Sequence, residues 1–201
     1  ISSIANKNNI PFWAFALTTA HAMYPEPSIR EIKLQQFSNL AYGAQGLQYF
    51  TYWTPEQGRD QDFHNGPIGL DWKRTEIYDR IKSVNQEIQN YAKFFLHSRL
   101  ISVAHTGKMR PTGTKYIDML PSPIKVLETS DNGAIISLLE KGNIQILAIV
   151  NRDFNNPMKL TIYTDEKVKR VQKDGKEISA RKYTPTTQID PGDMVLFTWT
   201  K

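Results

Sequence analysis

The chain has 201 residues, of which 40% are hydrophobic and 22% charged, and it carries a formal net charge of +5. This composition is typical of a globular protein and excludes a disordered, collagen-like or coiled-coil chain. Cysteine is absent, which excludes disulfides and thiolate sites, and no apolar run approaches the roughly 20 residues of a membrane span.

The two halves of the chain differ in composition. Residues 1–96 carry 9 Lys/Arg, 9 Asp/Glu and 16 of the 22 aromatic residues, whereas residues 97–201 carry 16 Lys/Arg and 11 Asp/Glu. The whole basic excess therefore lies in the second half. We expect two domains, over residues 1–97 and 98–201.

The first half predicts strands that alternate with helices. Residues 10–20 form a continuous apolar run, which is typical of a strand buried on both faces. Ser28 and Glu31 have the spacing of a capping box, which predicts a helix that ends near Gly43. Residues 46–53 predict a second strand. This order predicts a right-handed crossover and therefore parallel pairing of the two strands.

A polar segment over residues 54–74 follows the second strand. An irregular loop of this length inside a compact domain is usually functional. Thr75 then predicts the start of a long amphipathic helix. Its apolar stripe consists of Ile77, Ile81, Val84, Ile88, Tyr91, Ala92 and Phe95.

From residue 98 onward, short β-branched or alternating runs are separated by turn sequences. Seven or eight strands at this spacing predict an antiparallel β-sandwich. The expected strands cover residues 101–106, 125–129, 134–139, 144–151, 158–164, 168–172 and 194–199.

Two parallel strands cannot by themselves bury the many aromatic residues of the first half. We therefore expect residues 1–97 to be the end of a larger α/β domain. The predicted fold class is α/β followed by all-β.

Several stretches resemble a known family. PFWAFALTTAH (residues 11–21), LAYGAQGLQYFTYW (40–53) and FHNGPIGLDWKRTEIYDRIKSVNQEI (63–88) resemble the end of the (β/α)8 barrel of clan A glycoside hydrolases, in particular family 42 β-galactosidases. NRDF and PGDMVLF in the second half are similar to the β-sandwich that follows the barrel in such enzymes. The resemblance implies the last two β/α units of a TIM barrel plus an antiparallel β-sandwich.

The resemblance also implies hydrolysis of a glycosidic bond by two carboxyl groups, without a cofactor or a metal. The position expected for the nucleophile falls near residues 16–19, where the sequence has no carboxylate. The catalytic residues therefore stay unassigned, with Glu26 and Glu56 as candidates. The strand that carries the acid/base glutamate in the family is missing here, so we expect this chain alone to be inactive.

Chemistry in a barrel of this kind is expected at the carboxyl ends of the strands. Trp53 is the strongest candidate for substrate binding, because its flat ring suits the C–H face of a sugar. Tyr52, His21 and His64 are further candidates. Core packing is the alternative role for Trp53, and structural hydrogen bonding is the alternative for both histidines.

The expected partners are an oligo- or polysaccharide and either a missing N-terminal barrel segment or another chain. Basic residues gather at 167–182, but acids are interspersed and aromatic residues are not, which indicates a solvated hairpin rather than a nucleic-acid surface. The resemblance favours an extracytoplasmic location. A glycan-binding barrel without activity and a structural accessory module remain the alternatives.

Overall fold

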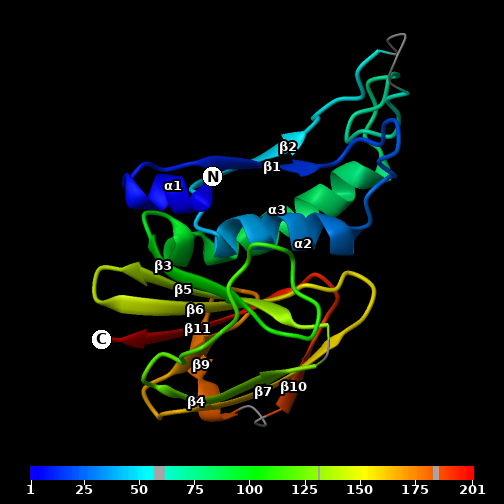
Figure 1. Ribbon diagram of the computed structural model, residues 1–201. Helices are drawn as coiled ribbons and strands as arrows, with labels where there is room; N and C mark the ends of the chain where they lie inside the picture. The colour runs from blue at the N-terminus through cyan, green and yellow to red at the C-terminus, as the bar shows by residue number, and fades with distance from the viewer. Residues whose placement is uncertain (57–61, 131, 183–185) are drawn as a thin grey trace.

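The computed structural model describes residues 1–56, 62–130, 132–182 and 186–201 and arranges them in four layers (Figure 1). A parallel pair of strands lies above two helices, which lie on a six-stranded sheet, and a three-stranded sheet forms the last layer. The helices are α1 (Ser2–Lys7), α2 (Ile29–Ala41) and α3 (Glu76–Phe95). The strands are β1 (Trp13–Leu17), β2 (Gly46–Phe50), β3 (Arg99–His105), β4 (Ile124–Thr129), β5 (Ala134–Lys141), β6 (Ile144–Asn151), β7 (Met158–Thr164), β8 (Lys169–Val171), β9 (Glu177–Ser179), β10 (Thr186–Ile189) and β11 (Met194–Thr200).

The six-stranded sheet is antiparallel, has the order β3-β5-β6-β11-β8-β9 and is buried on both faces. Successive side chains of a strand point to opposite faces. In β6, Ile146 and Ala148 accordingly pack toward the helices, whereas Leu147 and Ile149 pack toward the three-stranded sheet. This sheet is the centre of the molecule.

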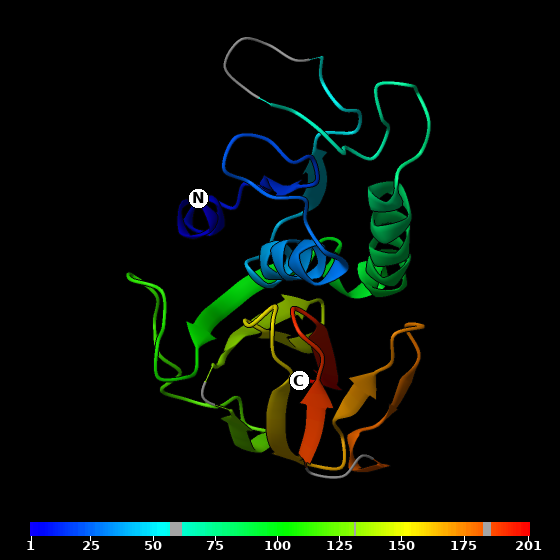
Figure 2. The same cartoon turned by 90° about the vertical axis from the view of Figure 1, so that its right-hand side faces the viewer.

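Helices α2 and α3 cover one face of the six-stranded sheet (Figure 2). Phe37 and Leu40 from α2 and Tyr91 and Phe94 from α3 pack against strand residues such as Leu196. This core joins the two halves of the chain across residue 97. The two parts therefore pack as neighbours through a shared core. The domain boundary at 97/98 stays a prediction.

The three-stranded sheet β10-β7-β4 covers the other face. Met158 and Leu160 of β7 pack against Val195 and Phe197 of β11. Every pair of strands in these two sheets is antiparallel. The antiparallel strands expected from residue 98 onward are confirmed.

Both main helices form where the sequence predicts them. The capping box of α2 is present: the Glu31 amide donates to Ser28 Oγ at 3.4 Å, and the Ser28 amide donates to a Glu31 carboxylate oxygen at 2.8 Å. Ile77 and Val84 of α3 are fully buried against α2, which confirms the apolar stripe. No helix in the described part of the chain is long and apolar enough to cross a membrane.

Strands β1 and β2 pair in parallel, as predicted, with Ala16 opposite Tyr49. The outer edge of β1 is closed by amide side chains of α2. Gln35 accepts a hydrogen bond from the Leu17 amide at 2.7 Å, and Asn39 donates to the Phe15 carbonyl at 3.2 Å. These side-chain amides make hydrogen bonds to the backbone of β1 that a neighbouring strand would otherwise make.

The predicted TIM-barrel end is wrong. Within the described residues the parallel sheet has two strands and does not close, and the remaining sheets are antiparallel. The helices pack on an antiparallel sheet rather than on a ring of parallel strands. The structure is therefore mainly β, with three α-helices in its described part.

The upper face of the β1–β2 pair carries exposed aromatic side chains, among them Trp13 and Phe15. Trp13 lies over Gly46, where an added Cβ would come within 2.5 Å of the indole ring. Glycine at position 46 thus lets the Trp13 ring approach the partner strand closely.

A cluster of charges connects α2, α3 and the turn before β11. Lys33 Nζ lies 2.6 Å from Glu87 and 3.6 Å from Asp193, and Lys173 also pairs with Asp193. The Asp193 side chain is only 4% exposed. A buried carboxylate needs a paired cation, because desolvation otherwise disfavours its charge.

We expect Lys33→Met to lower the free energy of unfolding by about 2–4 kcal/mol, because it leaves two carboxylates with less compensation. Urea denaturation followed by circular dichroism measures this change. Lys73→Met is the matched control, since Lys73 pairs with Asp71 on an exposed loop. We expect this substitution to lower the free energy of unfolding by about 0.5 kcal/mol or less. Equal effects of both substitutions would contradict the role of the cluster.

His105, at the end of β3, is buried and neutral. Arg152 donates to its Nδ1 at 3.0 Å, so the ring proton is on Nε2, which lies 2.7 Å from the Tyr42 hydroxyl. Burial, together with the nearby Arg152 and Arg110 guanidinium groups, lowers the pKa of His105 to about 4. Protonation would place a second cation against Arg152.

This arrangement predicts a pH-dependent stability. Because the unfolded chain binds the His105 proton near pH 6.5 and the folded chain only near pH 4, stability is complete above pH 6.5. It falls by up to about 3 kcal/mol as the pH decreases to 4. Denaturation at pH 7, 5.5 and 4.5 measures the effect. In the His105→Gln variant the free energy of unfolding should change less between pH 6.5 and 4. An unchanged slope would contradict the assignment of this pH dependence to His105.

Candidate functional site

The segments that follow β1 and β2 are joined by threonines. The amides of Thr18 and Thr19 both donate to the Phe50 carbonyl, at 2.8 and 3.2 Å. The Thr51 amide donates to Thr19 Oγ1 at 3.1 Å, and the two hydroxyls lie 2.9 Å apart. Short polar side chains thus satisfy the backbone where the parallel strands end.

The loop over residues 62–75 is bonded to the same end. The His64 amide donates to the Ala20 carbonyl at 3.0 Å, and the Thr54 amide donates to the Ile68 carbonyl at 2.8 Å. The Thr54 hydroxyl accepts from the Gly66 amide at 2.9 Å. Thr75 donates its hydroxyl to the Gly66 carbonyl at 2.7 Å and makes no side-chain cap for α3.

Gly66 lies close against both strand ends. An added Cβ would lie 2.8 Å from Thr19 Oγ1 and 2.9 Å from Thr54 Oγ1. Only glycine therefore allows the loop to approach both strand ends. Close packing against the strand ends thus explains why the FHNG sequence ends in glycine, at Gly66.

An aromatic cluster forms around His21. Its ring stacks on Phe63 with 4.9 Å between centroids and also contacts Tyr24 and Phe50. His21 Nδ1 lies 2.9 Å from the Thr19 carbonyl, which only accepts, so Nδ1 carries the proton. In the neutral ring Nε2 is then an acceptor for a hydroxyl group.

Trp53 and Trp72 form an exposed pair. Their ring centroids lie 5.3 Å apart with a tilt of 55°, and the two residues are 47% and 73% exposed. Trp53 is therefore not a core residue. Trp72 was not predicted as a site residue, although a tryptophan in a polar loop is itself unusual.

Glu26 is engaged through both carboxylate oxygens. One oxygen accepts from Arg80 at 2.7 Å and the other from the Asn65 amide group at 2.9 Å. These contacts connect the segment after β1, the 62–75 loop and α3. The carboxylate therefore has a positioning role, and no pattern in the sequence indicates Arg80 as its partner.

The other predicted residues lie at the same end but do not converge. Tyr52 is exposed and faces α3 rather than Trp53. His64 is half-exposed, and its Nδ1 lies 2.9 Å from the Asp62 carbonyl. Glu56 is exposed ahead of residues 57–61, which lie outside the described part of the chain.

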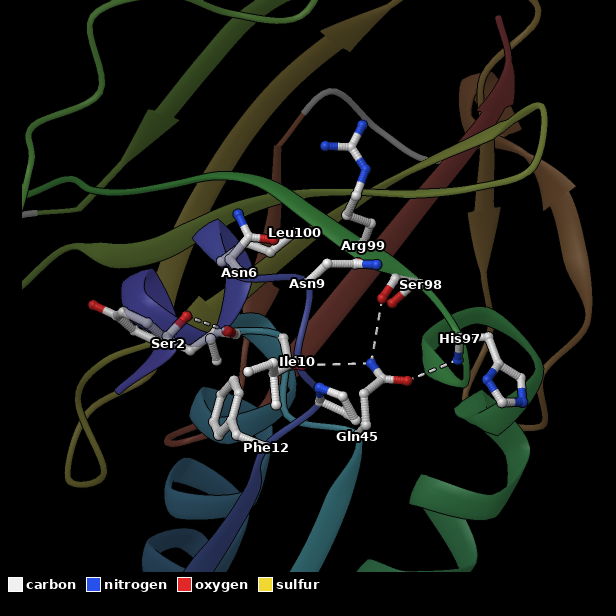
Figure 3. A pocket seen from close by; sticks show the side chains of 14 residues that line it. Ser2, Asn6, Asn9, Ile10, Phe12, Gln45, His97, Ser98, Arg99 and Leu100 are labelled. Carbon is white, nitrogen blue, oxygen red and sulfur yellow. Dashed lines mark hydrogen bonds between the residues drawn. The ribbon is translucent and has the colours of Figure 1, made fainter.

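A hollow lies at the amino end of the β1–β2 pair, opposite the candidate site (Figure 3). It has a volume of about 290 Å³ and lies between α1, the start of β1 and the start of β3. Gln45 donates to the Phe95 and Ser98 carbonyls and accepts from the His97 amide at 2.7 Å. This side chain joins β2 to the end of α3, so it serves the fold.

No group of three or more His, Asp or Glu side chains in the described ranges is placed to hold a metal ion. The candidate site therefore consists of the Trp53–Trp72 pair, the cluster around His21 and the hydroxyl and amide groups that hold them in place.

Comparison with known proteins gives little at the level of sequence, since no family model and no curated protein matches the chain. Among solved structures the chain is similar to the α-fucosidase of Thermotoga maritima, in complexes with a mechanism-based inhibitor and with fucose. Both matches have 9% identity and a TM-score of 0.46 and cover 96% or 95% of this chain. The chain spans 40% of the fucosidase's length.

A TM-score of 0.46 is too low to establish a common fold. The likeness accordingly assigns no activity to this chain. The resemblance to family 42 glycoside hydrolases likewise stays a prediction.

We expect Thr54→Val to loosen the 62–75 loop, because it removes the acceptor of the buried Gly66 amide. Leaving this buried amide without an acceptor lowers the stability of the closed loop by about 1–3 kcal/mol. Amide hydrogen exchange at Gly66 and Ile68 measures this local opening. Thr54→Ser keeps the hydroxyl and is the control; equal exchange in both variants would refute the role of that hydrogen bond.

Proposed function

We propose that the carboxyl ends of β1 and β2 form a carbohydrate-binding surface and that the chain belongs to a glycoside hydrolase. The Trp53–Trp72 pair carries the proposal. Two exposed indole rings from neighbouring segments, tilted 55° to each other, leave apolar surface that a ligand can cover. Sugars combine an apolar C–H face with hydroxyl groups, and an indole offers both a flat apolar face and an N–H donor.

The groups around this pair suit a neutral, hydroxyl-rich ligand. His21 presents Nε2 as an acceptor at the same end of the strands. Tyr24, which contacts His21, is half-exposed and adds a hydroxyl that both donates and accepts. The sequence resemblance to glycoside hydrolases supports the same class of ligand.

For this chain the proposal is binding rather than bond cleavage. Hydrolysis needs two carboxyl groups about 5–10 Å apart. Both oxygens of Glu26 already bind Arg80 and Asn65, so this side chain is poorly suited to transfer a proton. Hydrolysis is therefore proposed for a longer protein in which other residues supply the carboxyl groups. An extracytoplasmic location belongs to the same proposal.

We expect Trp72→Ala to weaken binding of neutral sugars about 3–10-fold, since an aromatic contact contributes about 0.5–1.5 kcal/mol beyond its buried area. Isothermal titration of galactose and short galacto-oligosaccharides measures the affinity. Trp13→Ala is the matched control, because Trp13 is also exposed but lies at the amino end of β1.

Two outcomes would refute the proposal. One is that neither galactose nor the oligosaccharides bind the unaltered chain. The other is that Trp13→Ala and Trp72→Ala change the affinity equally, which would favour a structural accessory role for this half of the chain.

A further inference from the structure

A groove runs between the outer side of β2 and α3. Its first part has a volume of about 380 Å³ and is lined in part by Tyr49, Tyr52 and Tyr78 and by the amide side chains of Asn85, Gln86 and Gln89. A second cavity of about 560 Å³ adjoins it and shares Tyr49, Asn85 and Gln89. We call the first part the α3 groove.

The lining of the α3 groove is mostly apolar in area, with hydroxyl and amide groups among the apolar side chains, and it is almost without charge. Lys82 is its one charged residue within the described chain. An anionic ligand would need further cations, and a cationic ligand would need a carboxylate, so the lining favours a neutral ligand. Amide side chains both donate and accept hydrogen bonds, which matches hydroxyl groups.

Several of the lining side chains are held in place. The Tyr49 hydroxyl donates to Asn85 Oδ1 at 2.7 Å, which leaves the Asn85 amide hydrogens as donors. Burial raises the pKa of Tyr49 to about 12, so this donor stays protonated at neutral pH. The Arg74 guanidinium lies 4.3 Å above the Tyr78 ring and fixes its position. Pre-ordered groups reduce the entropy lost on binding.

Tyr52 relates the groove to the candidate site. It lines the α3 groove, whereas Trp53, its neighbour in sequence, pairs with Trp72. The two side chains point in different directions, but the residues are consecutive, so their Cα atoms lie about 3.8 Å apart. The closeness of the two backbone positions is the basis for expecting one oligosaccharide to reach both surfaces.

We propose that the α3 groove binds a neutral sugar unit of an oligosaccharide whose neighbouring unit contacts the Trp53–Trp72 pair. The inference rests on the proposed function, because it assumes the same class of ligand. It adds a second contact surface, assigned to Tyr52, Gln86 and Gln89, and it predicts that affinity increases with the length of the ligand.

The test compares galactose with a β-1,4-linked galactotetraose by isothermal titration of the full chain. We expect Gln86→Ala/Gln89→Ala to weaken tetraose binding about 5–30-fold, because two hydrogen bonds to the ligand are lost. Galactose binding should stay unchanged. Both residues are exposed on α3, so the fold is retained. Ser83→Ala is the control, since Ser83 is exposed on α3 but does not line the groove.

Tyr52→Ala provides an independent variant on the β2 side of the groove, and we expect the same selective loss of tetraose affinity. NMR spectra should show shifts of the Asn85, Gln86 and Gln89 side-chain amides with tetraose and not with galactose. These observations together would establish the groove as a second sugar-contacting surface.

The experiment distinguishes a failure of the groove inference from a failure of the proposed function. If Trp72→Ala weakens tetraose binding but the groove variants do not, the groove inference is wrong and the proposed function stands. If neither sugar binds, both fail. If an apolar strand-forming peptide shifts the groove amides and tetraose does not, the groove is a protein-binding surface and the inference is overturned.

Discussion

The whole arrangement depends on one constraint, which is that the six-stranded sheet carries apolar side chains on both faces. Such a sheet needs cover on each side. The three-stranded sheet covers one side, and α2 and α3 cover the other. The same two helices carry β1 and β2 on their far side. The position of the candidate site therefore follows from how the helices are anchored on the sheet.

Local sequence patterns predicted most elements, because each pattern reflects a local requirement. The Ser28–Glu31 spacing located α2, and alternating apolar residues located strands such as β6 and β7. Helix α1 and the short strands β9 and β10 were missed, since they bury few apolar side chains. The barrel was predicted from the family resemblance and from the expectation that two parallel strands need further cover. In the described residues α2 and α3 carry the pair, and Gln35 bonds the free edge of β1.

Only part of the candidate site could be predicted from the sequence. The rule that parallel strands carry function at their carboxyl ends selected Trp53 and His21, and the structure places both there. Their partners come from elsewhere in the chain. Trp72 reaches Trp53 because the intervening loop folds back, and Arg80 reaches Glu26 across 54 residues. Such contacts depend on tertiary packing, which no local spacing encodes.

The place of β11 in the sheet has a consequence for biosynthesis. This strand lies between β6 and β8, in the interior of the six-stranded sheet, yet it follows the other five strands of that sheet in the chain. At translation rates of about 5–20 residues per second, the apolar faces of α2 emerge roughly 8–30 seconds before β11 arrives. During that interval Phe37 and Leu40 lack part of their final contacts. The nascent chain thus exposes apolar side chains at a stage when chaperones can bind it, and a chain truncated before β11 lacks one of the two central strands of the sheet.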